Sequence, residues 1–266
     1  MLTFENTKNA KPIVKIAGGA RDREIIYLDP ERSDSNAEYF DEFRLPDDDE
    51  GKLQVLHNNK TEREICYIQG ASGSGKSYWT SKYLEDYKRK HPKNLLVLFS
   101  NVDDDECLDK LGVKRIKLSN NLWEEPLKCG DFQDMCVIMD DVDSISDRKI
   151  RMAVLAILNE ILQQGRHHNT TCLLTYHAPT GGLMTRMILN ESHKVVVFLQ
   201  SGTNRGMRYL LENYCGIDKD DVKKLKREKT RATCFHKNYP QMVSNDKMIR
   251  MLYKDSSGDE SDSAQM

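Results

Sequence analysis

The stretch Gly70-Ala-Ser-Gly-Ser-Gly-Lys-Ser77 follows five mostly apolar residues, Ile65-Cys-Tyr-Ile-Gln69, and precedes a segment with helical spacing of its aromatic residues. It matches the pattern G-x-x-x-x-G-K-[ST] in the strand–loop–helix context that the pattern requires. Glycines let successive backbone N–H groups curl around phosphate oxygens, and the start of the helix adds partial positive charge. The stretch therefore predicts a phosphate-binding loop, and the alternative of an ordinary glycine-rich turn is the weaker one.

The expected cofactors of such a loop are ATP and Mg²⁺, and each loop residue then has an expected role. Lys76 is expected to reach the β- and γ-phosphate oxygens and to act in catalysis, and the Ser77 hydroxyl is expected to bind Mg²⁺. The whole loop is predicted to contact the nucleotide, and its members are Gly70, Ala71, Ser72, Gly73, Ser74, Gly75, Lys76 and Ser77.

A pair of acids follows a second apolar run, Cys136-Val-Ile-Met139, about sixty residues downstream. An acid at the end of a neighbouring strand binds Mg²⁺ in P-loop enzymes, so we assign Asp140 to the metal. Asp141 stands where a carboxylate can polarise an attacking water, which is a catalytic role. The alternative is that Asp141 only caps the following turn.

Short apolar runs alternate with helical segments from residue 64 onward. Runs that are apolar on both faces are typical of strands in a buried parallel sheet. The predicted strands are Ile65–Gln69, Leu95–Phe99, Cys136–Met139, Cys172–Tyr176 and Val195–Leu199. The predicted helices are Ser77–Lys90, which stops before Pro92, and Arg148–Gln164, which ends at Gly165 with an expected left-handed cap. The predicted fold class is α/β, a P-loop NTPase with a mostly parallel central sheet flanked by helices.

Three regions differ in composition. Residues 1–60 combine short apolar pieces with Gly, Pro and acidic clusters, so we expect a small, peripheral, β-rich segment. Residues 61–254 form the predicted ATPase domain. Residues 255–266 contain nothing to bury and are predicted to be a disordered acidic tail.

The overall composition excludes several classes of protein. The chain has 266 residues, a formal charge of -2, and no apolar run or leader typical of a membrane span or a signal peptide. Seven cysteines without a C-x-x-C spacing predict reduced thiols rather than a disulfide framework or a zinc site. The chain has no overall excess of positive charge that would indicate nucleic-acid binding, so only the local distribution of charge can indicate it.

A third set of residues suggests a subfamily. The dipeptide Gly165-Arg166 ends the long helix, a strand then leads to His177, and Asn190 precedes the strand Val195–Leu199. In this order the chain resembles the FtsK–HerA superfamily of DNA-pumping ATPases, over residues 60–215. Within it, the chain resembles the small genome-packaging ATPases of poxviruses, giant viruses and virophages.

The resemblance implies further roles. The superfamily has a polar γ-phosphate sensor, generally Gln, where this chain has His177, and Asp-Glu where it has Asp140-Asp141. Such motors form homo-oligomeric rings in which an arginine completes the neighbouring subunit's site. Arg166 is the favoured catalytic arginine because it belongs to the Gly-Arg motif, with Arg186 and Arg205 as the other candidates. Each of the three could equally be a surface arginine.

The segment Lys219–Arg231 holds seven basic and three acidic residues, a net charge of 7 - 3 = +4. Lys and Arg neutralise DNA phosphates, so this segment is the candidate contact with the backbone of double-stranded DNA. The alternative, a solvated helix face, is at least as common.

The expected function is an ATP-driven translocase of double-stranded DNA that packages a viral genome. Its expected partners are DNA, other copies of the chain in a ring, and capsid or portal proteins. Its expected location is the cytoplasm or virus factory of an infected cell, or the virion. The alternatives are a nucleotide-dependent assembly or remodelling factor, and a helicase-like ATPase.

Overall fold

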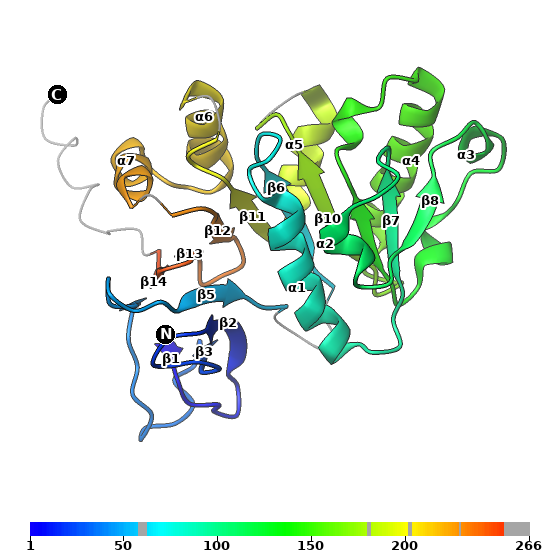
Figure 1. The fold of residues 1–266 in the computed structure, drawn as a ribbon. Helices are drawn as coiled ribbons and strands as arrows, with labels where there is room; N and C mark the ends of the chain where they lie inside the picture. The colour runs from blue at the N-terminus through cyan, green and yellow to red at the C-terminus, as the bar shows by residue number, and fades with distance from the viewer. Residues whose placement is uncertain (58–62, 180–181, 202–203, 229, 253–266) are drawn as a thin grey trace, which may run out of the picture.

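The computed structural model describes residues 1–57, 63–179, 182–201, 204–228 and 230–252. These residues form a large mixed sheet covered on both faces, with a smaller sheet at one end of the molecule (Figure 1). No helix in these ranges is long and apolar enough to cross a bilayer.

The large sheet has the strand order β4-β14-β13-β12-β11-β6-β10-β9-β7-β8. One side of it is parallel and consists of β11 (Lys194–Val197), β6 (Ile65–Gln69), β10 (Thr171–Tyr176), β9 (Cys136–Met139), β7 (Leu96–Ser100) and β8 (Lys114–Lys117). The other side is antiparallel and consists of β12 (Thr233–His236), β13 (Met242–Asn245), β14 (Met248–Met251) and β4 (Glu42–Arg44). Because β6 is central, the loop that follows it has a strand on either side.

The helices cover both faces of this sheet. One face is packed by α4 (Arg148–Gln164), α5 (Gly182–Glu191), α6 (Asn204–Tyr214), α7 (Lys219–Arg227) and the short α3 (Asn121–Glu124). The other is packed by α1 (Lys76–Lys90), α2 (Glu106–Asp109) and the small N-terminal sheet.

The alternation of side chains along β6 divides the core in two. Ile65 and Tyr67 belong to the cluster beneath α4, whereas Cys66 and Ile68 belong to the cluster beneath α1. Successive side chains of a strand point to opposite faces, so a strand covered on both faces has to be apolar throughout. All five residues of β6 are buried, which explains its continuous apolar sequence.

The predicted α/β fold with a mostly parallel sheet and flanking helices is confirmed, and the five predicted strands lie within one or two residues of β6, β7, β9, β10 and β11. The expected left-handed cap at Gly165 is wrong, since its φ is -56°. Glycine is needed there for close packing instead. A Cβ would lie 2.4 Å from the Ile161 carbonyl oxygen and 2.6 Å from Arg63 Nη1.

The N-terminal segment forms its own antiparallel sheet in the order β1-β3-β2-β5. The prediction of a β-rich N-terminal segment is therefore confirmed. Its strands are β1 (Leu2–Thr3), β2 (Lys11–Ala17), β3 (Ile25–Leu28) and β5 (Lys52–Val55). In Figure 1 this sheet lies next to β13 and β14, and β4 from the same segment pairs with β14. The predicted boundary at residue 60 and the predicted tail at 255–266 lie outside the described residues.

Candidate active site

The phosphate-loop candidate joins the end of β6 to the start of α1, as predicted. Gly73 and Gly75 have φ values of 73° and 109°, which side chains rarely allow. Gly75 precedes the first helical residue and has no side chain to cap the helix, so the first N–H groups of α1 face the loop. A Cβ on Gly70 would lie 2.3 Å from Ser74 Oγ, so this position also requires glycine.

The loop fits a phosphate on a second observation. The Ser74 hydroxyl oxygen is buried, and it has no hydrogen-bond partner among the described residues. A buried hydroxyl without a partner costs free energy, and a phosphate oxygen in the cradle would remove that cost.

Lys76, the first residue of α1, brings three elements together. Its side chain is only 8% exposed. Its Nζ lies 3.1 Å from the Gly70 carbonyl oxygen, 3.4 Å from Asp141 Oδ1 and 3.3 Å from His177 Nδ1. The ammonium group is therefore held between the loop, the end of β9 and the end of β10.

Asp140 directly follows β9, and two hydroxyl groups hold its carboxylate. Thr175 Oγ1 donates to Oδ1 at 2.7 Å, and Ser100 Oγ donates to Oδ2 at 2.9 Å. The pKa of Asp140 is raised above its usual value, mainly by burial and also by the charge of Asp141. The hydrogen bond from Thr175 opposes this shift. Placing a cation here would favour the charged carboxylate.

Asp141 adopts a left-handed backbone conformation, with φ at 45°. Its N–H donates to Thr175 Oγ1 at 2.9 Å, which fixes the turn. The following 3-10 turn (Val142–Ser144) is closed by the Asp141 backbone carbonyl, not by its side chain. The carboxylate instead faces Lys76 and lies 2.8 Å from His177 Nε2.

His177 follows β10, and its side chain is 39% exposed. One ring nitrogen contacts Asp141 and the other contacts Lys76, so the ring bridges the two predicted catalytic groups. Its backbone is fixed as well, because the N–H donates to Asp143 Oδ2 at 3.3 Å and the carbonyl accepts from Gln69 Nε2 at 2.9 Å. The sensor role of His177 remains a prediction.

The donor set suits Mg²⁺ bound together with nucleotide. Ser77 and Asp140 offer hard oxygen ligands, and Mg²⁺ commonly takes one or two protein ligands while phosphates and waters fill the rest. The described residues contain no cluster of three or more His, Cys, Asp or Glu side chains that could hold a metal ion.

Of the three predicted arginines, Arg166 lies away from Lys76. Arg166 is exposed in the turn before β10, at the edge of the sheet opposite the phosphate loop, where it lines a pocket with Glu64 and His193. Arg186 and Arg205 are exposed on α5 and α6. The structure thus gathers Lys76, Asp140, Asp141 and His177 at one edge, and leaves Arg166 at the other.

The basic segment Lys219–Arg231 folds mainly as α7. Val222 and Leu225 are buried, and Lys223 and Lys224 form ion pairs with Asp220 and Asp221 on the same helix. These pairs reduce the charge available on that face. The DNA contact therefore stays a prediction.

Sequence reasoning missed the two hydroxyl groups that hold the acids. Ser100 ends β7, and Thr175 is the last residue but one of β10. Both occur at the carboxyl end of an otherwise apolar run in a parallel sheet, where functional groups collect. A polar residue at that position was the available signal.

Comparison with known proteins places the chain in a family. No protein-family model matches it. A Sputnik virophage protein, described as Uncharacterized protein V3, is 37% identical over 246 residues, covering 91% of this chain and 96% of that protein.

Two solved structures resemble this chain with TM-scores below 0.5, so we draw no conclusion about function from them. The genome packaging NTPase B204 from Sulfolobus turreted icosahedral virus 2, in complex with AMPPCP, is 15% identical with a TM-score of 0.49, covering 71% of this chain and 98% of that chain. The pCW3 conjugation coupling protein TcpA, in a monomer form with ATPgS, is 12% identical with a TM-score of 0.43, covering 91% and 77%. The identity with V3, which extends over nearly all of both chains, shows that this P-loop protein belongs to the family of the Sputnik virophage protein V3.

Proposed function

We propose that the chain is an Mg²⁺-dependent ATPase that translocates double-stranded DNA and packages a viral genome. The observation that supports hydrolysis most is the meeting of Lys76, Asp141 and His177 within 3.4 Å at the end of a phosphate-binding loop. A loop that only bound phosphate would not need a carboxylate and an imidazole there.

Each side chain then has a chemical task. Lys76 neutralises charge on the transferring phosphoryl group, and the loop amides hold the phosphates in position. Asp141 orients a water and accepts its proton, while His177 holds the Asp141 carboxylate in place. Ser77 and Asp140 would hold Mg²⁺, which supplies charge neutralisation at the phosphates.

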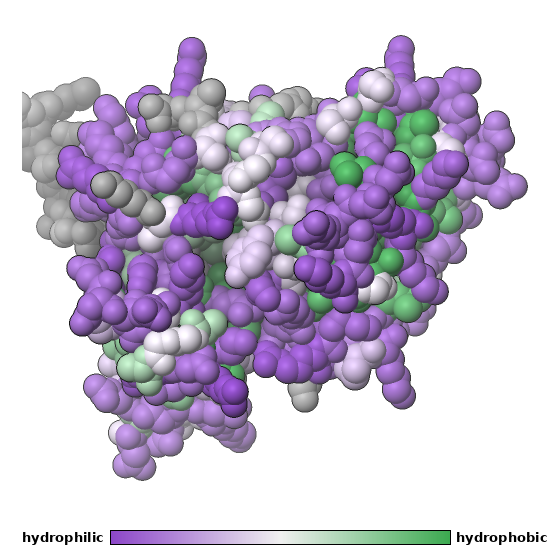
Figure 2. Space-filling view, viewed as in Figure 1, coloured by the Kyte–Doolittle hydropathy of each residue, from purple (hydrophilic) through white to green (hydrophobic). Residues whose placement is uncertain are grey.

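A ring of subunits accounts for two features. Arg166 lies across the sheet from Lys76, so it could complete only the site of another copy. Val102 is 56% exposed, and its N–H donates to Ser100 Oγ, the hydroxyl that also bonds Asp140. Figure 2 shows a largely hydrophilic face with hydrophobic residues exposed toward the side of β7 and β8. A neighbour covering Val102 would lie beside the metal-binding acid.

The choice of DNA as the polymer depends on two further points. The relative V3 comes from a virophage, which favours a viral role. The last turn of α7 lies next to the carboxyl end of β11, since Gln200 Nε2 donates to the Lys226 carbonyl oxygen at 2.9 Å. The Lys223 and Lys224 side chains on α7 are 55% and 67% exposed. Tracking of a phosphate backbone needs such residues and no reading of bases.

The test is ATP hydrolysis by the purified protein, with and without long duplex DNA. Lys76→Ala is the blank, and Lys93→Ala, in the exposed turn after α1, is the matched control. We expect duplex to stimulate the wild type and Lys93→Ala several-fold, and Lys76→Ala to be inactive. Hydrolysis that ignores duplex would contradict the translocase and favour an assembly or remodelling factor.

A further inference from the structure

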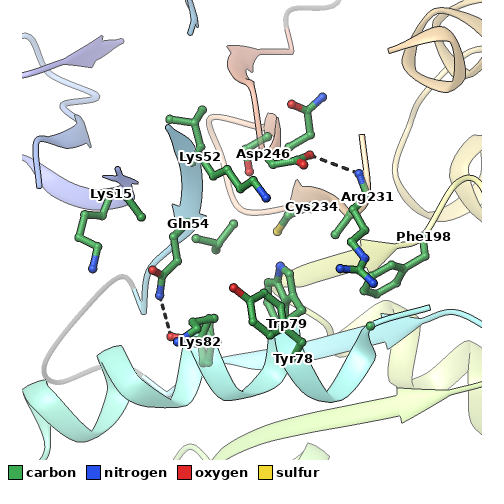
Figure 3. A pocket seen from close by; sticks show the side chains of 18 of the residues that line it. Lys15, Lys52, Gln54, Tyr78, Trp79, Lys82, Phe198, Arg231, Cys234 and Asp246 are labelled. Carbon is green, nitrogen blue, oxygen red and sulfur yellow. Dashed lines mark hydrogen bonds between the residues drawn. The ribbon is translucent and has the colours of Figure 1, made fainter. Parts of the chain in front are cut away.

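A pocket of about 490 Å³ lies beside the phosphate loop, between α1, the N-terminal sheet and the C-terminal strands (Figure 3). Gly75, the last residue of the loop before α1, is part of its wall. None of the side chains assigned above to hydrolysis lines it, so its function is still open.

The position of the catalytic side chains fixes which way a nucleotide runs. Asp141 and His177 follow β9 and β10, which lie on one side of β6. The pocket lies on the other side, at Phe198 just after β11 and at Arg231 just before β12. With the γ-phosphate at Asp141, as the proposed function has it, a nucleoside on the other side of the loop would enter the pocket.

The pocket offers an aromatic surface for a base. Tyr78 follows Ser77 directly, lines the pocket and is 54% exposed. Next to it, the Trp79 ring stacks on Tyr83 with 5.6 Å between centroids and an angle of 16°. This stacking fixes the wall behind Tyr78, and stacking between an aromatic side chain and a base accepts any base.

The pocket also offers cations at both of its ends. Near the loop, a Cβ on Gly75 would lie 3.4 Å from Arg231 Nε and 3.5 Å from the Phe198 ring, so these two side chains flank the loop. At the opposite wall, the N-terminal sheet contributes Lys15 and Lys52, and Figure 3 shows Lys52 reaching into the pocket.

A hydrogen bond ties the N-terminal wall to the helix. Gln54 Nε2 on β5 donates to the Lys82 carbonyl oxygen of α1 at 2.8 Å (Figure 3). The two walls are thus held at a fixed separation, as a binding pocket for a rigid ring requires.

We propose that this pocket binds the base and ribose of the nucleotide, with Tyr78 stacked on the base, Arg231 next to the α-phosphate and ribose, and Lys52 closing the pocket from the N-terminal sheet. The proposal rests on the phosphate loop holding a nucleotide. It makes the N-terminal sheet a part of the nucleotide site rather than a separate appendage.

The test compares two ligands by equilibrium titration, a non-hydrolysable ATP analogue and inorganic tripolyphosphate, which lacks the nucleoside. Tyr78→Ala is expected to weaken binding of the ATP analogue roughly tenfold and to leave tripolyphosphate binding unchanged. Tyr78→Phe, which keeps the ring, should bind like the wild type. Tyr209→Ala removes another exposed tyrosine, on α6, and should change neither ligand.

Lys52→Ala tests the N-terminal wall and is expected to weaken binding of the ATP analogue about threefold, again without effect on tripolyphosphate. Equal weakening of both ligands by Tyr78→Ala, or no weakening of either, would overturn the proposal. Loss of duplex DNA binding with unchanged affinity for the ATP analogue would also overturn it and assign the pocket to DNA. If instead Lys76→Ala left the affinity for both ligands intact, the phosphate loop itself would be wrongly assigned.

Discussion

The two ends of the central strands carry similar charged groups in opposite surroundings. At the carboxyl end, the Asp141 and His177 side chains are 25% and 39% exposed around Lys76. At the amino end, Lys194 and Glu64 are 1% and 6% exposed, and Lys194 Nζ lies 2.5 Å from Glu64 Oε1.

At the sealed end, the chain's own groups bind the Glu64 carboxylate. His57 Nδ1 lies 2.8 Å from Glu64 Oε2, and the Tyr83 hydroxyl donates to the same oxygen. Burial alone would raise the pKa of Glu64, but Lys194 and His57 outweigh it and hold that pKa well below its usual range. The comparison teaches that an ion pair surrounded by the chain's own partners has a structural role. An ion pair that solvent still reaches is instead a candidate functional site.

The largest effect on stability should come from removing one partner of the buried Lys194–Glu64 ion pair. Lys194→Met leaves the Glu64 carboxylate buried without its main partner, so we expect the free energy of unfolding to fall by about 3–5 kcal/mol in urea titrations. The double variant Lys194→Met with Glu64→Gln removes both charges and should lose much less. A loss below about 1 kcal/mol for the single variant would show that the pair is not sealed.

The matching change at the open end should affect chemistry and not stability. Asp141→Asn removes the proposed proton acceptor, so turnover of ATP should fall by about a hundredfold or more. Binding of a non-hydrolysable ATP analogue, and the urea midpoint, should stay close to wild type. Wild-type turnover by this variant would remove Asp141 from the mechanism and weaken the contrast.

Acid should act on the sealed side first. Burial lowers the pKa of His236 to about 3, with a further lowering by the charge of Lys194 and an opposing effect of Glu64. Below pH 6.5 the unfolded chain therefore binds a proton that the folded chain does not, and stability is lost as pH falls. We expect a loss of about 2 kcal/mol between pH 7 and pH 5 from this group.

The check is the pH dependence of unfolding in His236→Asn, with His167→Asn, an exposed histidine, as the matched control. The first variant should flatten the acid slope and the second should not. An unchanged slope in His236→Asn would locate the acid sensitivity elsewhere.

The smallest effect should come from the hydroxyl that supports the acids. Thr175→Val keeps the shape but removes the bonds to Asp140 and to the Asp141 N–H. We expect about 1 kcal/mol of lost stability, since a buried N–H and a carboxylate lose a partner. Thr175→Ser should recover most of it, and equal losses in both variants would point to packing of the methyl group instead.

Sequence alone predicted what is local. The loop Gly70–Ser77 and the pair Asp140-Asp141 are contiguous, and their strands are apolar on both faces, so pattern and position suffice. The sealed cluster joins residues 57, 64, 83 and 194, and no sequence pattern links them. The antiparallel strands β12 to β14 are short and their sequence is mixed, so only pairing in the fold identifies them.

The pairing of β4 with β14 also dictates when the protein can fold during synthesis. Arg44 of β4 pairs with Met248 of β14, so β4 cannot form its pairing until a strand about two hundred residues later has been synthesised. Until the ribosome releases the C-terminal strands, the first residues have an unsatisfied edge that is open to other chains. Stalled or truncated products lacking β14 should therefore aggregate or be degraded, even when their phosphate loop is complete.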